Sequence, residues 1–152
     1  MAEGDVQKIT DRLRRLCSRR EYCTSDILKK AVTALDGDKE AAAKVLEVLV
    51  SEKYVDDLRY ATAYAREKAM IAGWGETKIR YMLSAKRIDR SLVDQALTEI
   101  DAGKADSRLQ KLLEHKAKIL KADPQIRLKL LRFALGRGYQ YDDVVRVLQD
   151  IL

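Results

Sequence analysis

Apolar side chains recur every three or four residues along most of this chain, which is the spacing of helices that bury one face. Val6, Ile9, Leu13 and Leu16 give the first clear example, and Ile71 is expected to face inward near the end of a later helix. β-branched residues occur at the same spacing and not in alternating runs. With one Pro and seven Gly in the sequence, the pattern predicts an all-α protein.

Polar caps and short turns separate the periodic segments. Asp56 or Asp57 is expected to begin a helix that the Gly-Trp-Gly turn at 73–75 ends, because two glycines are unfavourable inside a helix. Asp123-Pro124 predicts a restart, with Asp as the cap and Pro in the first turn. These signals divide the chain into three units of three helices each, at residues 6–55, 56–101 and 102–152.

The three units resemble diverged copies of one sequence. Residues 85–100 match residues 136–151 at a constant shift of 51, and at a shift of 48 Val48 of the first unit falls on Ala96. Chance alignment of amphipathic helices is the alternative, but the shared turns and caps favour true repeats. Each unit alone is too small to bury its apolar faces, so three tandem three-helix repeats predict an elongated, curved array.

The net charge of +6 is distributed unevenly. Residues 1–55 carry 11 basic and 10 acidic side chains, residues 56–101 carry 8 and 8, and residues 102–152 carry 11 and 6. A basic C-terminal third suggests a polyanion or an acidic protein surface as the partner. A basic surface also keeps proteins soluble, so charge alone leaves both explanations open.

Two groups of basic residues could contact a polyanion. They occupy the middle helix and the following turn of the second and third units, and Lys78 superposes on Lys129 at the 51-residue shift. Repetition in register would place positive charge along one edge of the array, where it could follow phosphates. The alternative is that each group is the solvated face of an amphipathic helix. The candidate residues for binding DNA or a protein partner are Lys78, Arg80, Lys86, Arg87, Arg127, Lys129, Arg132 and Arg137.

Trp74 is the best candidate among the aromatic residues for a side chain that stacks on single-stranded bases, because it lies in a turn between two glycines. A Trp at such a corner more often fills the gap between neighbouring helices. Tyr60 and Tyr64 are four residues apart among apolar neighbours, which is more typical of a core than of a binding platform.

No catalytic, metal or cofactor site is predicted. The single histidine, His115, lies mid-helix without an orienting partner, and Cys17 and Cys23 have no second pair that would complete a zinc site. We therefore expect a binding protein and not an enzyme. No apolar run approaches the roughly 18 residues of a membrane span, and no signal segment opens the chain. These features predict a cytoplasmic protein.

Two motifs resemble those of a known family. Residues 56–61, Asp-Asp-Leu-Arg-Tyr-Ala, resemble the Asp-Asp-x-Arg-Phe-Ala stretch of the RecX family, the bacterial regulators of the RecA recombinase. Residues 132–139, Arg-Phe-Ala-Leu-Gly-Arg-Gly-Tyr, resemble its C-terminal Arg-Phe-Leu-x-x-Arg-Gly-Phe segment. The likeness covers about residues 19–152. Arg87 departs from the family, which more commonly has Gly there, a residue better suited to a left-handed helix end.

The resemblance implies three tandem three-helix repeats and a role in DNA recombination, DNA repair and the SOS response. RecX-like proteins bind RecA and its filament on single-stranded DNA, and they limit strand exchange and ATP hydrolysis by blocking filament growth or promoting disassembly. Some also bind DNA themselves. The resemblance thus implies a non-enzymatic, cofactor-free inhibitor of RecA, and we expect a monomer that does not associate with membranes.

Two other hypotheses remain open from the sequence. A helical nucleic-acid-binding protein with no RecA contact would use the same basic residues. A helical-repeat scaffold that binds a peptide would instead need a large exposed apolar groove.

Overall fold

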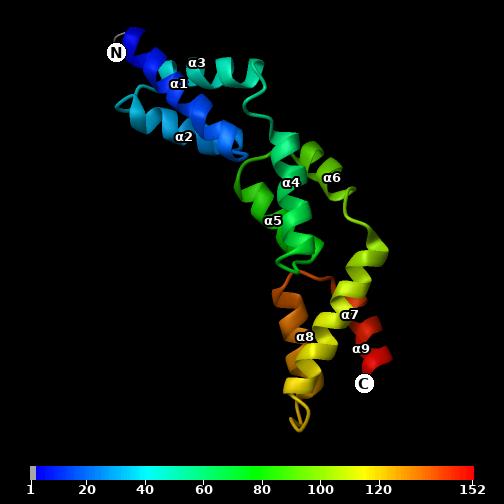
Figure 1. The fold of residues 1–152 in the computed structure, drawn as a ribbon. Helices are drawn as coiled ribbons and strands as arrows, with labels where there is room; N and C mark the ends of the chain where they lie inside the picture. The colour runs from blue at the N-terminus through cyan, green and yellow to red at the C-terminus, as the bar shows by residue number, and fades with distance from the viewer. Residues whose placement is uncertain (1–2) are drawn as a thin grey trace. The chain divides into compact units, whose positions relative to one another are not determined.

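The computed structural model describes residues 3–152, and all regular structure in this range is helical (Figure 1). The nine helices of the described residues confirm the all-α prediction. Their bounds are α1 (Glu3–Arg19), α2 (Thr24–Ala34), α3 (Lys39–Ser51), α4 (Asp57–Met70), α5 (Glu76–Ala85), α6 (Arg90–Leu97), α7 (Ala102–Ile119), α8 (Ile126–Gly136) and α9 (Tyr141–Ile151).

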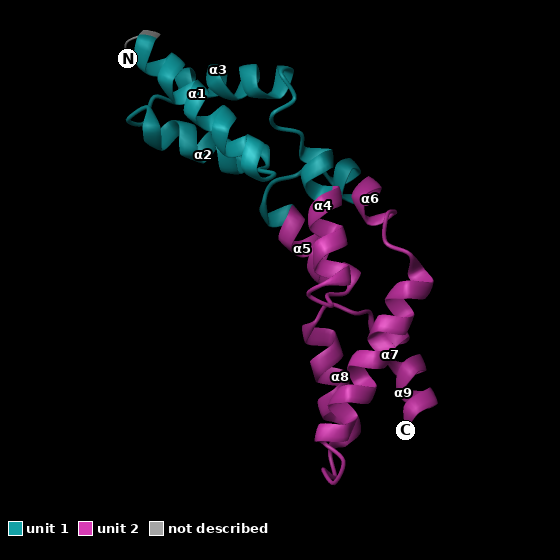
Figure 2. Cartoon of the chain, in the orientation of Figure 1, with its two compact units in different colours: residues 1–61, 84–93 teal, residues 62–83, 94–152 magenta. Residues whose placement is uncertain are grey.

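Contacts group these helices into two compact units (Figure 2). Unit 1 comprises Met1–Ala61 and Ser84–Val93, and unit 2 comprises Thr62–Leu83 and Asp94–Leu152. Each unit therefore consists of two separate chain segments, and α4, α5 and α6 each contribute residues to both. The division of the chain after residues 55 and 101 stays a prediction.

Helices α1, α2 and α3 enclose the core of unit 1. Leu13, Ile27 and Leu49, one from each helix, are at most 2% exposed. Burial of a side chain of this size contributes roughly 1.5–3 kcal/mol. Packing of the three apolar faces, more than intrinsic helix propensity, therefore holds the unit together.

Helices α7, α8 and α9 enclose the core of unit 2 in the same manner. Leu109 and Leu113 are four residues apart on one face of α7, and both are fully buried. They pack in one cluster with Leu130 of α8 and Leu148 of α9. The spacing that predicted these helices thus also predicted which face would be buried.

The starting residues of the third helices give the spacing between successive repeats. These helices begin at intervals of 51 residues, at Lys39, Arg90 and Tyr141. The 48-residue shift for the first copy is therefore wrong: it places Val48 on the buried Ala96, whereas Val48 is 38% exposed. The two shifts differ by three residues, nearly one helical turn, so both bring apolar positions onto apolar positions.

The expectation that Ile71 faces inward is also wrong, because its side chain is 80% exposed. Helix α4 ends at Met70, one residue earlier. Ile71 therefore lies beyond the last helical position, where the helical periodicity no longer decides which way a side chain points.

Left-handed residues end the middle helices of the second and third repeats. Gly138 follows α8 with φ 95°, and Arg87 follows α5 with φ 60° at the equivalent position 51 residues earlier. The arginine, which seemed ill suited to a left-handed helix end, adopts one nonetheless. A side chain in this conformation costs roughly 1–2 kcal/mol relative to glycine, so packing of the turn must stabilise it.

Two chain turns meet backbone to backbone in unit 2. Gly75 N–H donates to Arg137 O at 2.8 Å, and Thr77 N–H donates to Gly138 O at 3.0 Å. The turn after α8 thereby satisfies free N–H groups at the start of α5. A Cβ at Gly75 would overlap the backbone of Gly138, and a Cβ at Gly138 would lie 2.6 Å from Lys78 N. Only glycine permits this approach from both sides.

We expect Gly75→Ala and Gly138→Ala each to lower the free energy of unfolding by about 2 kcal/mol or more, since both introduce overlap and the second also strains a left-handed residue. Urea denaturation followed by circular dichroism measures the change. Gly136→Ala is the matched control, because Gly136 has nothing within 4 Å of its Cβ position; it should stabilise the protein by about 0.5 kcal/mol. Equal effects of all three substitutions would contradict this account of the turns.

Candidate functional site

A second turn-to-helix contact, in unit 1, holds one of the predicted binding residues. Ser25, in the first turn of α2, donates its hydroxyl to Lys86 O at 2.7 Å. The Lys86 ammonium pairs with Asp26 at 2.9 Å. Lys86 and Arg137 are equivalent residues of successive repeats, so the turn after α5 contacts the start of α2 much as the turn after α8 contacts the start of α5. The side chains of Lys86 and Arg137 both help to hold these turns, Lys86 through Asp26 and Arg137 through Ala72 O.

The Asp-Asp-x-Arg motif that carries the family resemblance also has structural partners. Both the backbone N–H and the hydroxyl of Thr24 donate to the Asp57 carboxylate, each at 2.8 Å. Asp56 caps its own helix by accepting from Arg59 N at 3.0 Å. The Arg59 side chain pairs with Glu21 at 2.6 Å, and this hydrogen bond raises the pKa of Arg59. The motif therefore joins the start of α4 to the segment that opens α2.

The ion pair between Lys86 and Asp26 changes the pKa of both groups. Burial acts to raise the pKa of Asp26, but hydrogen bonds from Lys86 and Cys23 and the nearby positive charges outweigh it, and the net pKa is lowered. The hydrogen bond to Asp26 raises the pKa of Lys86 against a smaller opposing effect of burial. The pair therefore stabilises the folded state at pH values above the pKa of Asp26 and below the pKa of Lys86.

Lys86→Gln should lower the free energy of unfolding by about 0.5–1 kcal/mol at neutral pH, the upper range for a partly exposed pair. The folded pKa of Asp26 lies below its unfolded value of about 4, so this stabilisation is present above that pH and disappears as the pH falls through the folded pKa. Urea denaturation at several pH values measures the difference between variant and wild type. Lys44→Gln, at an exposed position, is the control, and a difference that persists in strong acid would contradict the role of Asp26.

Most of the eight predicted basic residues form ion pairs, hydrogen bonds or ring contacts with other residues of the chain. Arg80 pairs with Asp94 at 2.5 Å and Glu76 at 3.4 Å, and these contacts raise its pKa. Lys129 pairs with Asp123. Arg137 donates to Ala72 O at 2.8 Å and lies over the ring of Phe133. The equivalent residues Lys78 and Lys129 have different partners, since Lys78 lies over the Trp74 ring and Lys129 pairs with Asp123. The eight predicted residues therefore do not form one free basic edge.

Trp74 fills a corner of unit 2. Its ring meets that of Tyr64 edge to face, with centroids 6.3 Å apart. The Lys78 ammonium lies 4.3 Å and the Lys68 ammonium 5.0 Å from the centre of the indole. Tyr64 and the two lysines thus contact the indole, which agrees with the packing role that the sequence left open.

Three of the predicted basic residues keep exposed side chains without an ion pair among the residues that the structure describes: Arg87, Arg127 and Arg132. Two of them lie on α8, a helix without acidic residues. Leu128 and Leu135 lie on the same helix and are 41% and 40% exposed. A hollow of about 440 Å³ at the start of this helix is lined by Leu128, Arg127 and Leu131, among others. We call the exposed residues Arg127, Leu128, Arg132 and Leu135, together with the partly buried Leu131, the α8 face.

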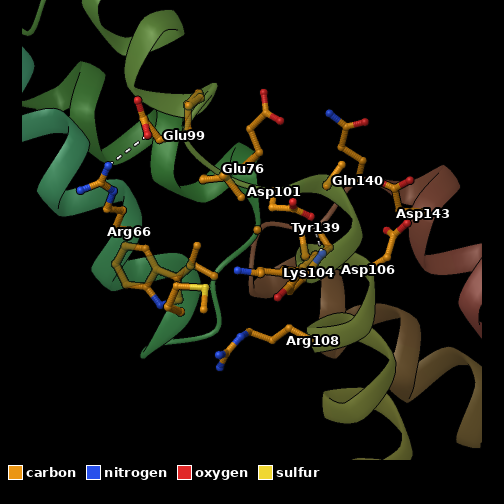
Figure 3. Close-up of a pocket in the computed structure, with 18 of the residues that line it drawn as sticks. Arg66, Glu76, Glu99, Asp101, Lys104, Asp106, Arg108, Tyr139, Gln140 and Asp143 are labelled. Atoms are coloured by element: carbon orange, nitrogen blue, oxygen red, sulfur yellow. Dashed lines mark hydrogen bonds and ion pairs between the residues drawn. The ribbon is translucent and has the colours of Figure 1, made fainter.

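Unit 2 also contains a cleft of about 570 Å³ between α4, α7 and α9 (Figure 3). Ala69, Met70, Trp74, Leu97 and Ile100 form much of its apolar lining. The position of this cleft was not predicted from the sequence.

The charged side chains around this cleft are largely paired with each other. Arg66 pairs with Glu99 at 3.0 Å, and Arg146 pairs with Asp106 at 2.9 Å. Figure 3 shows Lys104 and Arg108 extending from α7 toward the α4 side of the cleft. The lining carries four basic and five acidic residues, which suits a peptide of mixed polarity better than a phosphate. This mixed, partly charged lining also differs from the large exposed apolar groove that the hypothesis of a peptide-binding scaffold requires.

Lys104 and Arg108 were not among the predicted site residues. Their spacing of four residues, on the side of the helix opposite Leu109 and Leu113, is the signal in the sequence that could have found them. Among the described residues no group of His, Cys, Asp and Glu is arranged to hold a metal ion, and no described helix is long and apolar enough to cross a membrane.

The tandem three-helix units place this chain in a class of all-helical repeat proteins. The family model for the second three-helix domain of RecX matches residues 56–97, and the model for the third three-helix domain matches residues 105–148. Together these matches cover more than half of the chain. The chain belongs to the RecX family.

Individual relatives agree with this assignment. The regulatory protein RecX of Vibrio campbellii is 33% identical over 131 residues, which is 85% of this chain and 82% of that protein. The regulatory protein RecX of Clostridium tetani is 34% identical over 119 residues, 76% of this chain, and the chain spans only 54% of that longer relative. The crystal structure of RecX from Lactobacillus salivarius has the same fold, with a TM-score of 0.87 at 20% identity over 99% of this chain and 98% of that one.

Proposed function

We propose that this protein binds RecA and its filament on single-stranded DNA and limits the recombinase and ATPase activity of that filament. Membership of a family whose relatives are named regulatory proteins carries the proposal. In this role the chain has no catalytic step of its own, and it acts as a monomer in the cytoplasm, where RecA assembles on DNA.

The α8 face is the surface that we assign to RecA contact. It combines exposed Leu128 and Leu135 with Arg127 and Arg132, which have no ion pair among the described residues. Arginine and apolar side chains are the types that protein interfaces favour, whereas lysine is depleted there. This composition supports a protein partner for α8 more than a phosphate backbone alone.

A binding protein can slow a filament in two ways that differ in stoichiometry. If it occupies every RecA subunit, inhibition requires about one molecule per subunit. If it occupies filament ends, one molecule blocks the addition of many subunits, because growth occurs only there. We favour the second mode, so inhibition should begin well below equimolar protein.

Sub-stoichiometric protein should therefore slow the DNA-dependent ATP hydrolysis of the cognate RecA, measured as phosphate release on single-stranded DNA. A pull-down of RecA with and without single-stranded DNA should show some capture in both conditions. No effect on hydrolysis at stoichiometric excess would overturn the proposal. Binding to bare single strands without any capture of RecA would support instead a nucleic-acid-binding protein with no RecA contact.

Arg127→Glu combined with Arg132→Glu should raise the concentration needed for half-inhibition by about tenfold or more, since truncation or reversal at an arginine anchor typically costs over 1 kcal/mol. Lys39→Glu combined with Lys44→Glu changes the net charge equally at exposed positions on α3, and it should have little effect. Equal behaviour of the two double variants would exclude the α8 face as the contact. Circular dichroism spectra confirm that each variant is folded.

A further inference from the structure

Two cationic side chains of unit 2 line the cleft between α4, α7 and α9 without a partner. Lys104 and Arg108 lie four residues apart on α7, and both belong to the lining. In Figure 3 they extend from α7 toward the α4 side of the cleft. Neither side chain makes an ion pair, a hydrogen bond or a ring contact within the described part of the chain. The cleft therefore contains two positive charges that the fold does not neutralise.

The acidic residues of the same lining all have partners. The Glu99 carboxylate accepts from Arg66 at 3.0 Å, and the Asp106 carboxylate accepts from Arg146 at 2.9 Å. The three other carboxylates are held by residues close in sequence: Glu76 by Arg80, Asp143 by Arg146, and Asp101 by the backbone N–H of Lys104. The lining thus has two free cations and no free carboxylate, so an anionic group on a ligand would be attracted to Lys104 and Arg108.

The Tyr139 hydroxyl is a third polar group of the cleft without a partner. Tyr139 lines the cleft and is only 8% exposed, and its hydroxyl has no hydrogen bond to any described residue. Every fully buried side-chain oxygen in the described chain does have a partner, so the small exposed area of Tyr139 includes its hydroxyl. Burial raises the pKa of Tyr139 against the opposing charges of Arg108 and Arg137, so the hydroxyl is protonated at neutral pH and can donate. A buried polar group usually has a hydrogen-bond partner, and here a ligand would supply it.

Apolar side chains from α4 and from the segments after α4 and α6 form much of the remaining lining. Met70 is 47% exposed, and Trp74 and Ile100 are partly exposed. Covering apolar surface contributes roughly 25 cal/mol per Å², so these side chains favour a ligand that brings apolar groups of its own. The cleft thus combines free positive charge, a hydrogen-bond donor and an apolar surface within one volume of about 570 Å³.

We propose that this cleft binds a short peptide segment in which acidic and apolar residues alternate. Side chains of an extended peptide point alternately to opposite sides, so its carboxylates can meet α7 while its apolar groups cover Met70 and Trp74. The Arg108 guanidinium can hold a carboxylate through two parallel hydrogen bonds, Lys104 adds a point charge, and the Tyr139 hydroxyl donates a further bond. Charge and apolar surface together favour this partner over a nucleic acid, whose backbone offers charge but no apolar side chain.

This proposal goes beyond binding to RecA and involves none of the residues of the α8 face, so the two can fail separately. The probe is a fluorescein-labelled peptide of six residues that alternates glutamate and leucine, titrated with the full chain and followed by fluorescence anisotropy. In one control peptide glutamine replaces glutamate, and in the other serine replaces leucine. The glutamate–leucine peptide should bind about tenfold or more tightly than either control. Equal binding of all three peptides would overturn the proposal.

Substitutions test each of the three polar groups in turn. Lys104→Gln and Arg108→Gln should each weaken binding of the glutamate–leucine peptide by about fivefold or more, and they should affect the uncharged glutamine–leucine peptide much less. Tyr139→Phe removes one hydrogen bond and should weaken binding by about threefold to tenfold. The matched controls are Lys111→Gln and Tyr141→Phe, at exposed positions outside the lining, and they should bind like wild type. Cleft variants that behave like these controls would contradict the assignment.

A second measurement needs no substitution. Trp74 is the only tryptophan of the sequence and lines the cleft, so its fluorescence emission reports directly whether the cleft is occupied. The unlabelled glutamate–leucine peptide should shift this emission to shorter wavelength as it covers the ring, with the same midpoint as the anisotropy titration. Unchanged emission at saturating peptide would place the binding elsewhere and overturn the proposal. Tighter binding of decanoate or of oligothymidylate, measured by the same emission, would overturn it in favour of an anionic lipid or a nucleic acid.

Discussion

The contact between the turn after one middle helix and the start of the preceding middle helix is the constraint on which both units depend. In unit 2 backbone groups make the contact, with Gly75 N–H on Arg137 O at 2.8 Å, and the Arg137 side chain adds a hydrogen bond to Ala72 O. In unit 1 a side-chain hydroxyl, Ser25, makes the corresponding bond to Lys86 O at 2.7 Å. One repeat therefore caps the helix of another, and the N–H groups or side chains at that helix start gain partners that the helix itself cannot supply.

This constraint explains why much of the positive charge is not available to partners. The basic residues at the turns, Lys86 and Arg137, are the ones whose charge is used to hold the turn. The side chains of Lys104 and Arg108 on α7 have no such neighbour among the described residues. Paired and unpaired cations nevertheless occur on the same helix, since Lys129 of α8 pairs with Asp123 while Arg127 and Arg132 have no ion pair among the described residues.

The helices and their buried faces could be predicted from the sequence because each depends on local spacing, as with Leu109 and Leu113. The site could not, because pairing is decided by residues distant in the chain: Lys86 meets Asp26 across 60 positions. The 51-residue shift of the last two repeats was found because turns and caps repeat there. The 48-residue shift failed because an error of about one helical turn leaves the apolar pattern unchanged.

The interleaved composition of the units has a consequence for how such a chain is made and how it could have arisen. Unit 1 needs residues 84–93, which follow a segment that belongs to unit 2. A ribosome must therefore pass residue 93 before the first unit can close. Neither unit is a single contiguous stretch, so the segment that is duplicated in the sequence and the segments that pack together are out of phase. Copying one repeat would add length without adding an autonomous domain.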